Sequence, residues 1–358
     1  MEPNPQDNNQ TSPVISQVVN SPKTSKYNKK LWLVTGFIIL LAGIGGYYLL
    51  QNKTVVSNNN YVKSASPTLV PELKPKYIGN YEVILKDNPK TPCDRYAHRC
   101  TNDVYLKDKS TGNEIYILTT DNLLRNDSRV PEYRNGYIFL PKRVGNDNYP
   151  SNDWTDELWV YTDKNQGKKI LSNKGFTYLV NPSASKIAIK YGDSNPLKIN
   201  VIDKNGNILK QYNQDNFKDI KQFVASLDLV EWENDNILWL LLGGGSLNYQ
   251  NISSLDTSLD KATTYDLSKL NIGAELEFNA KLKKIAYSTF PVMFDSTTAD
   301  EFIKSGQKVY LYLYDLNTKS SKLISTSVVK AFKPQWISDT IIEYNDPNSD
   351  KRITLQIN

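Results

Sequence analysis

The chain has 358 residues, of which 39% are hydrophobic, and a formal net charge of +5. The charge is +2 over residues 1–30 and +3 over residues 51–76, so residues 77–358 are electroneutral. A neutral main part lacks the basic footprint that nucleic-acid binding needs, and no nucleic-acid partner is expected.

Residues 1–28 are rich in Asn, Gln, Ser and Pro. We expect a disordered cytoplasmic tail, because so few apolar side chains cannot offset the entropy of the chain. Residues 29–51 are predicted to be a transmembrane signal-anchor helix. Its core, residues 31–50, has no charged residue over 20 positions, which spans about 30 Å of bilayer hydrocarbon. The aromatic residues expected at the two membrane interfaces are Trp32, Tyr47 and Tyr48.

The distribution of lysines predicts the orientation of this helix. Four lysines precede the apolar run and only two follow it closely, so the N-terminus should be cytoplasmic. A cleavable signal peptide is the alternative, but its apolar region would be shorter and a small-residue cleavage site would follow. We therefore predict a single-pass protein of the cell membrane, in contact with the bilayer through residues 31–50, whose main domain is extracytoplasmic.

Residues 52–76 are predicted to form a flexible linker, in which residues 66–70 could supply a strand to the folded domain. The only two cysteines, Cys93 and Cys100, lie close together in a loop-like stretch. An extracytoplasmic location permits a disulfide between them. The alternative is a zinc site with His98, the only histidine, but such a site requires further ligands and a different spacing.

Residues 77–358 consist of short alternating strand patterns broken by Gly, Asn, Asp and Pro. One unit, an aromatic or apolar residue followed by a polar turn and an apolar strand, recurs six times at intervals of 46 to 58 residues. Its copies begin at Tyr77, Tyr133, Val180, Trp232, Phe278 and Trp336. A second unit, a strand ending in aspartate followed by a turn and a strand, lies between these copies. Its aspartates are Asp108, Asp163, Asp203, Asp266 and Asp315.

Two hairpins per repeat make a four-stranded sheet, and 40 to 50 residues per sheet is the period of a propeller blade. We therefore predict an all-β, six-bladed β-propeller over residues 77–358. The last repeat lacks a fourth strand, which residues 66–70 would supply on ring closure. A stacked β-sandwich is the alternative, although it would not require the repeat.

The unit NPSASKIAI at residues 181–189 and the unit EWENDNILWL at residues 231–240 resemble TolB-type repeats, which are related to WD-type repeats. The resemblance covers residues 66–358 and implies a six-bladed propeller of the TolB-like kind. The family pattern Pro-x-Ser-Pro-Asp-Gly is met only loosely, so the resemblance implies a fold more than a function. Peptidases with this propeller also carry a Ser–Asp–His triad, but the sequence has no G-x-S-x-G motif, which speaks against a serine hydrolase.

No cofactor or metal site is predicted. The segment DKNGN at residues 203–207 resembles the start of a calcium loop, but the glycine and glutamate that should follow are replaced, and a hairpin turn explains it better. An acidic cluster could also hold a cation, although solvated loop carboxylates are the commoner explanation. Its members are Asp147, Asp153, Asp156 and Glu157. Residues 296–306 should contain a short surface helix.

The connections between the second and third strands of each blade should emerge on one face, and four of them are expected to be long: 87–102, 142–156, 243–261 and 289–308. They contain the residues of the predicted binding face: Arg95, His98, Arg99, Arg143, Tyr149, Trp154 and Tyr249. Aromatic and arginine side chains are common anchors of binding sites. We therefore predict a non-enzymatic binding or scaffolding module for a protein, a peptide or a cell-envelope glycan. The alternative is a propeller-type lyase or glycosidase with carboxylates at the channel mouth.

Overall fold

The computed structural model describes residues 74–357 except for the segments 89–99, 125–129, 147–152, 165, 193–197, 218–225, 244–248, 293–295 and 350. The chain divides into two units, Met1–Val70 and Pro71–Asn358. The predicted tail, anchor helix and linker, together with Trp32, Tyr47 and Tyr48, lie outside the described residues. Within the described part of the chain, no helix is long and apolar enough to cross a bilayer.

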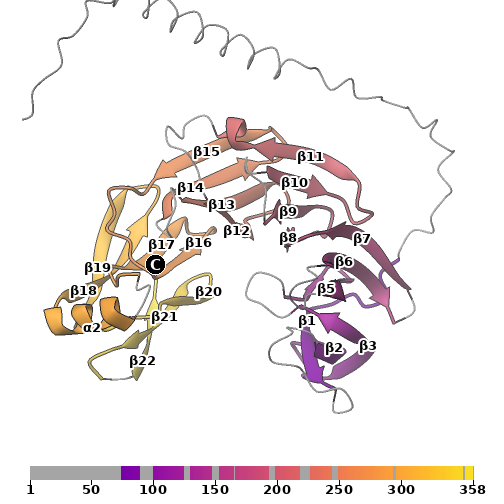
Figure 1. Cartoon of the computed structure of the whole chain (residues 1–358), viewed down its shortest axis with the longest axis horizontal. Helices are drawn as coiled ribbons and strands as arrows, with labels where there is room; N and C mark the ends of the chain where they lie inside the picture. Colours follow the sequence, from indigo (N-terminus) through magenta and orange to yellow (C-terminus); the bar gives the residue numbers. More distant parts are fainter. Residues whose placement is uncertain are drawn as a thin grey trace, which may run out of the picture. The chain divides into compact units, whose positions relative to one another are not determined.

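The described part of the second unit is built almost entirely from antiparallel strands (Figure 1). The first sheet holds the first two repeats, with the strand order β1-β2-β3-β5-β6-β7 and β4 paired to β5. Its strands are β1 (Tyr81–Asp87), β2 (Cys100–Asp108), β3 (Glu114–Leu123), β4 (Glu132–Arg134), β5 (Tyr137–Asn146), β6 (Asp153–Asp163) and β7 (Gln166–Asn173). The two repeats are joined by one pair, Leu123 with Lys142.

Each of the next three repeats forms its own four-stranded sheet. The strands of the third repeat are β8 (Phe176–Val180), β9 (Ile187–Tyr191), β10 (Lys198–Ile202) and β11 (Ile208–Asn213), which the 3₁₀ helix η1 (Gln214–Asn216) follows. Those of the fourth are β12 (Ser226–Trp232), β13 (Ile237–Gly243), β14 (Tyr249–Asp256) and β15 (Lys261–Asp266). Those of the fifth are β16 (Leu276–Asn279), β17 (Lys284–Ser288), β18 (Lys308–Asp315) and β19 (Ser320–Val328), with the predicted helix present as α2 (Ser296–Ser305).

The sixth repeat is a three-stranded sheet of β20 (Gln335–Ser338), β21 (Ile341–Asp346) and β22 (Lys351–Gln356). Within the second unit, the sheets follow one another in chain order along an arc from β1 to β22 (Figure 1). The all-β fold of propeller-like blades is thus confirmed. A closed six-bladed ring stays a prediction, because the described strands do not pair into a closed circle and residues 66–70 are not described.

Two predicted segments were wrong in the fourth repeat. The second hairpin of this repeat has its turn at Asp256, whereas Asp266, the predicted turn residue, ends β15. The long connection expected over residues 243–261 contains β14. This strand is polar along much of its length, which hid it, but its Ile252 and Leu255 are fully buried. Packing against the neighbouring strands therefore outweighed the local composition. The connection expected over 142–156 is also shorter, because β5 and β6 pair as far as Asn146 with Asp153.

Apolar clusters fill the interfaces between consecutive repeats. Between the first two repeats, for example, Val104 and Leu106 of β2 pack in one cluster with Ile138 and Leu140 of β5. Burying both faces of a sheet is what a blade requires, because a single sheet cannot cover itself.

Aromatic donors near the start of the repeats add hydrogen bonds across these interfaces. Each donates to a backbone carbonyl of the preceding repeat or of the chain that leads into it. The bonds are Tyr133 Oη to Tyr77 O at 2.8 Å, Tyr178 Oη to Val130 O at 2.6 Å, Trp232 Nε1 to Leu179 O at 3.1 Å and Trp336 Nε1 to Glu277 O at 3.4 Å. In the third repeat the donor is Tyr178, whereas Val180, with which the predicted unit begins, lies two residues further along the same strand. In four of the repeats an aromatic side chain near the start therefore links the repeat to the one before it.

The aspartates of the repeated strand–aspartate–turn–strand pattern cap hairpin turns. The carboxylate of Asp203 accepts hydrogen bonds from Asn205 N at 2.8 Å, Asn207 N at 2.9 Å and Asn207 Nδ2 at 2.9 Å. Asp108, Asp256 and Asp315 likewise accept from backbone N–H groups two and three residues later. The hairpin interpretation of DKNGN is thus confirmed, since β10 and β11 pair on either side of it.

Candidate binding surfaces

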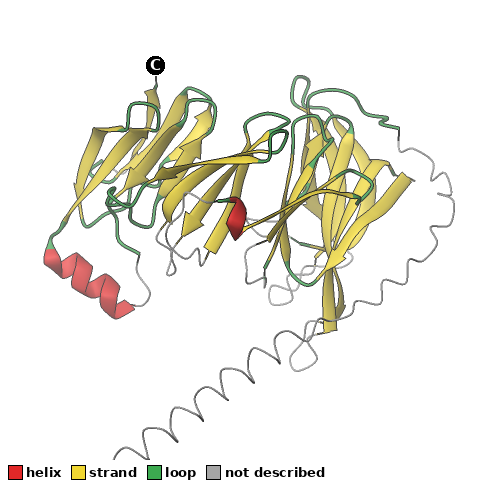
Figure 2. Cartoon of the chain, turned by 90° about the horizontal axis from the view of Figure 1, so that it is seen from above, coloured by secondary structure: helices red, strands yellow, loops and turns green. Residues whose placement is uncertain are grey.

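The antiparallel order of the strands places two kinds of connection at opposite ends of each sheet (Figure 2). Turns between first and second strands and between third and fourth strands share one end, which we name the turn face. Connections between second and third strands share the other end, which we name the connection face. Of the predicted binding residues, Arg143 lies in β5 and Trp154 in β6, near the connection-face end of this strand pair.

Two of the predicted binding residues, Arg143 and Trp154, come together beside Asp156. Arg143 donates from Nε and Nη2 to the two carboxylate oxygens of Asp156, at 2.8 and 3.2 Å. The guanidinium carbon lies 3.9 Å from the centroid of the Trp154 ring. Asp156 is fully buried, so its charge is balanced inside the protein by a bidentate partner. The arginine is thereby held in one orientation under the tryptophan ring.

The other predicted binding residues cannot be placed. Arg95, His98, Arg99 and Tyr149 lie outside the described residues, as does Cys93, and the side chains of Cys100 and Tyr249 are not described.

Two members of the predicted acidic cluster have protein partners. Asp156 is bound by Arg143, and Glu157 accepts from Trp159 Nε1 and Lys169 Nζ, each at 2.8 Å. Asp147 is not among the described residues. Over the described ranges, no group of three or more His, Cys, Asp or Glu residues could hold a metal ion. Asp156 and Glu157 are therefore bound within the protein by side chains of β5, β6 and β7.

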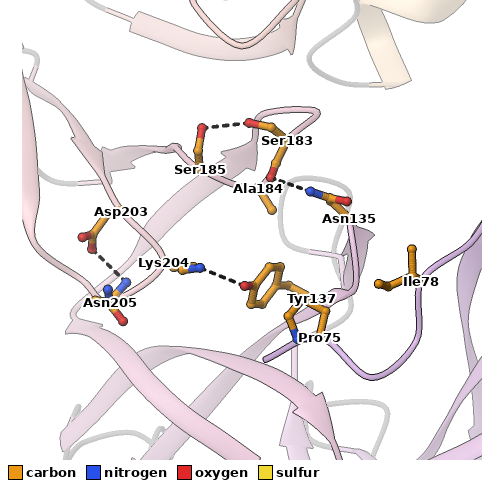
Figure 3. Close-up of a pocket in the computed structure, with 10 residues that line it drawn as sticks. All are labelled: Pro75, Ile78, Asn135, Tyr137, Ser183, Ala184, Ser185, Asp203, Lys204 and Asn205. Atoms are coloured by element: carbon orange, nitrogen blue, oxygen red, sulfur yellow. Dashed lines mark hydrogen bonds between the residues drawn. The ribbon is translucent and has the colours of Figure 1, made fainter. Parts of the chain in front are cut away.

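A cavity of about 420 Å³ opens on the turn face (Figure 3). Four segments line it: the chain that enters the first repeat, the β4–β5 turn, the β8–β9 turn and the β10–β11 turn. Its lining residues are Pro75, Ile78, Asn135, Tyr137, Ser183, Ala184, Ser185, Asp203, Lys204 and Asn205. We refer to it as the Tyr137–Lys204 pocket.

Polar groups converge in this pocket. Lys204 Nζ donates to Tyr137 Oη at 2.8 Å and lies 4.9 Å from the centroid of the same ring (Figure 3). Asn135 Nδ2 donates to the Ser183 carbonyl at 3.2 Å, which links two neighbouring repeats. The ammonium, the amides and the hydroxyls are groups that bind polar or anionic ligands, whereas Pro75 and Ile78 supply an apolar wall.

The walls of the pocket are fixed by close packing. Gly136 has φ of 86°, and a Cβ built there would lie 2.4 Å from Pro75 Cβ, so only glycine fits. Tyr133 Oη holds the entering chain by its bonds to the carbonyls of Tyr77 and Gly79. The sequence analysis missed this pocket. The Asn-Gly turns at residues 135–136 and 205–206 were visible, but nothing in the sequence indicated that they lie side by side.

Three carboxyl groups in or next to the first strand of a repeat are relevant to the alternative that the protein is a lyase or glycosidase. Glu231 of β12 accepts from Ala280 N at 2.6 Å, and burial raises its pKa. Glu275 accepts from Phe332 N at 3.1 Å and Lys333 N at 2.8 Å. Both carboxylates therefore join consecutive repeats. Glu132 of β4 differs from these two carboxylates. Burial raises its pKa to about 7, although Arg134 Nη2 lies 3.3 Å from Glu132 Oε2.

Comparisons with known proteins show structural resemblance only. No family model and no curated protein matches the chain. TolB from Acinetobacter baumannii is 13% identical, with a TM-score of 0.41 over 78% of this chain and 63% of its own. An oligogalacturonate lyase from Vibrio parahaemolyticus is 10% identical, with a TM-score of 0.46 over 72% of this chain and 73% of its own. A prolyl endopeptidase is 11% identical, with a TM-score of 0.45 over 76% of this chain and 39% of its own. Values this low carry no information about activity.

Proposed function

We propose that the chain is a TolB-like six-bladed propeller on a single-pass membrane anchor, which acts outside the membrane as a non-enzymatic binding or scaffolding module. Its N-terminus is cytoplasmic, and its connection face engages a protein, a peptide or a cell-envelope glycan. The observation that carries the proposal is the arrangement of Arg143 beneath Trp154 on that face.

This arrangement suits recognition because it is organised before any partner arrives. The buried carboxylate of Asp156 orients Arg143, so little side-chain entropy remains to be lost on binding. Tryptophan and arginine are also the residue types that dominate binding energy at interfaces. Arg95, Arg99 and Tyr149 lie outside the described residues. The proposal includes them in this surface, because the sequence predicts them in the connections between second and third strands.

Two of the carboxylates in or next to the first strands of the repeats also support binding rather than catalysis. Glu231 and Glu275 accept backbone N–H groups of the following repeat, which holds each carboxyl group at a fixed position within the fold. A general acid or nucleophile would instead direct its carboxyl group toward a substrate.

The proposal is tested by partner capture from the native envelope with the full chain. The variant Arg99→Ala/Tyr149→Ala should lose the partner, because both side chains would contact it directly. Lys204→Met, which alters the turn face, is the matched control and should retain capture. Loss of capture with Lys204→Met alone would place the partner on the turn face and refute the connection face as its site.

A carbohydrate-active enzyme is the second candidate, and Glu132 favours it. A carboxyl group with a pKa of about 7 is suited to donate a proton at neutral pH. Glu132→Gln should then abolish cleavage of an acidic or neutral polysaccharide without loss of folding. Cleavage that is absent from the parent chain, or that survives this substitution, would remove the enzymatic candidate.

The disulfide between Cys93 and Cys100 stays a prediction. Intact-mass analysis after alkylation without reductant should show no added label. Two labels would indicate free thiols and would contradict the pairing.

A further inference from the structure

The turn face is charged unevenly along the chain. In the first three repeats its segments are residues 74–80, 108–113, 134–136, 163–166, 181–186 and 203–207. They contain seven basic residues against three aspartates, a net charge of +4. The basic residues are Lys74, Lys76, Lys109, Arg134, Lys164, Lys186 and Lys204. We name this surface the basic turn face.

The last three repeats show no such excess. Their corresponding segments are residues 233–236, 256–261, 280–283, 315–320 and 339–340. They contain four lysines against six acidic residues, a net charge of −2. The basic excess is therefore not a general property of these turns, and it coincides with the repeats that form the Tyr137–Lys204 pocket.

The acidic residues of the basic turn face are directed into their own turns. Asp108 accepts from Ser110 N at 2.8 Å and Asp163 from Gln166 N at 2.9 Å, as Asp203 does in its hairpin. The exposed basic residues, among them Lys109 and Lys164, extend from the same turns into solvent. An approaching anion therefore meets ammonium groups before it meets carboxylates.

The position of the chain entry indicates which anionic surface lies nearby. The described domain begins at Lys74, on the basic turn face, and the predicted membrane core ends at residue 50. Of the 23 residues between them, residues 66–70 are the predicted ring-closing strand, and residues 51–65, if flexible as predicted, span about 21 Å on average. The face that carries the chain entry is thus held at a high effective concentration beside the bilayer. Its positive charge complements phosphate headgroups.

We propose that the basic turn face docks on an anionic lipid surface and that the Tyr137–Lys204 pocket receives a phosphate-bearing headgroup. The Lys204 ammonium and the amides of Asn135 and Asn205 supply hydrogen-bond donors for the phosphate. Ile78, which is 77% exposed at the pocket, adds an apolar contact with the interface. Docking in this way directs the connection face away from the bilayer, toward the partner. The inference takes only the membrane anchorage from the proposed function.

The test is lysine footprinting of the full chain reconstituted in lipid vesicles. Acetylation of individual lysines is measured by mass spectrometry in phosphatidylcholine vesicles and in vesicles that also contain phosphatidylglycerol. Lys109 and Lys164 should react several-fold more slowly in the anionic vesicles. The protection should disappear at about 0.5 M salt, where the Debye length is only about 4 Å. Lys281 and Lys319, exposed turn lysines of the fifth repeat, are internal controls and should not change.

A charge-removal variant extends the test. Each basic residue near an anionic surface changes binding by roughly fivefold, so Lys76→Gln/Lys109→Gln/Lys164→Gln should weaken docking by roughly a hundredfold. The readout in this variant is protection of Lys204, which is left intact. The matched control is Lys281→Gln/Lys319→Gln, which should leave the protection of Lys204 unchanged.

Three outcomes would overturn the proposal. The first is equal acetylation of Lys109 and Lys164 in both kinds of vesicle. The second is equal protection of the control lysines. The third is equal protection by soluble polyphosphate without lipid, which would assign the face to an anionic polymer. Partner capture through the connection face is measured separately, so a failure of the proposed function would not alter these results.

Discussion

The hydrogen bond from Tyr178 to the carbonyl of Val130 joins the third repeat to the chain that enters the second. The phenol is 3% exposed and its oxygen lies 2.6 Å from the acceptor. Tyr178→Phe removes one oxygen atom and leaves the ring in place. The net loss of such a bond is about 1 kcal/mol in the free energy of unfolding, and about 2 kcal/mol if water cannot reach the carbonyl. Val130 is half exposed, so we expect the lower value.

Tyr116→Phe is the matched control for this prediction. Its hydroxyl lies 2.9 Å from Thr119 Oγ1, but the side chain is 47% exposed, so water replaces the lost bond. Urea unfolding of the full chain in detergent, followed by tryptophan fluorescence, should show a loss of about 1 kcal/mol for Tyr178→Phe and less than about 0.5 kcal/mol for Tyr116→Phe. Equal losses for the two variants would refute the assignment of Tyr178 as a tie between repeats.

Three further predictions concern charge and backbone geometry. Arg143→Ala should lower the free energy of unfolding by about 3 kcal/mol or more, measured by urea unfolding, because a fully buried carboxylate loses its bidentate partner. Glu132 has a folded pKa of about 7 against 4.5 unfolded, so its contribution to stability is present below pH 4.5 and is lost as the pH rises to 7. Glu132→Gln should remove up to about 3 kcal/mol of pH dependence over that window, and an unchanged pH profile would contradict the shift. Gly136→Ala should destabilise the fold by more than about 2 kcal/mol, whereas Gly112→Ala, also at positive φ but with no atom within 4 Å of its Cβ, should cost about 1 kcal/mol in thermal unfolding.

The repeat could be predicted from the sequence because each copy meets the same local requirement. An aspartate that caps a hairpin recurs in five repeats and an aromatic or apolar residue before a turn in all six, and their spacing gives the number of strands. Where the local signal was ambiguous the prediction failed. Asp256 and Asp266 both begin polar turns, and only the burial of Ile252 and Leu255 distinguishes β14, the strand that ends at Asp256, from a loop.

The candidate surfaces could be predicted less well, because they depend on which repeats are neighbours. Trp154 and Arg143 were predicted as binding residues from their types and their place in an expected long connection, but their stacking and the buried Asp156 depend on the register of β5 with β6. The Tyr137–Lys204 pocket combines turns that are 67 residues apart in the chain. Such a site has no signature in one sequence, since each turn is also a satisfactory turn by itself.

The outer faces of the first and last sheets differ from the other blade interfaces. Consecutive repeats share apolar clusters, whereas no side chain on either outer face is buried among the described residues of these two sheets. These faces carry the ion pairs Lys86–Glu114, Lys107–Glu82 and Arg352–Glu343. Exposed pairs of this kind contribute about 0 to 1 kcal/mol each, so these pairs would add little to closure of the predicted ring at this seam.

Closure of the ring should therefore depend on backbone pairing, with the predicted strand at residues 66–70 beside β22. Proline has no N–H to donate, and only alternate residues of a strand direct their N–H toward one neighbour. One of the two variants Leu69→Pro and Val70→Pro should thus lower the free energy of unfolding of the full chain by about 1 kcal/mol or more. Leu69→Thr and Val70→Thr keep the N–H and are the matched controls. If neither proline variant differs from its control in urea unfolding, residues 66–70 do not close the ring.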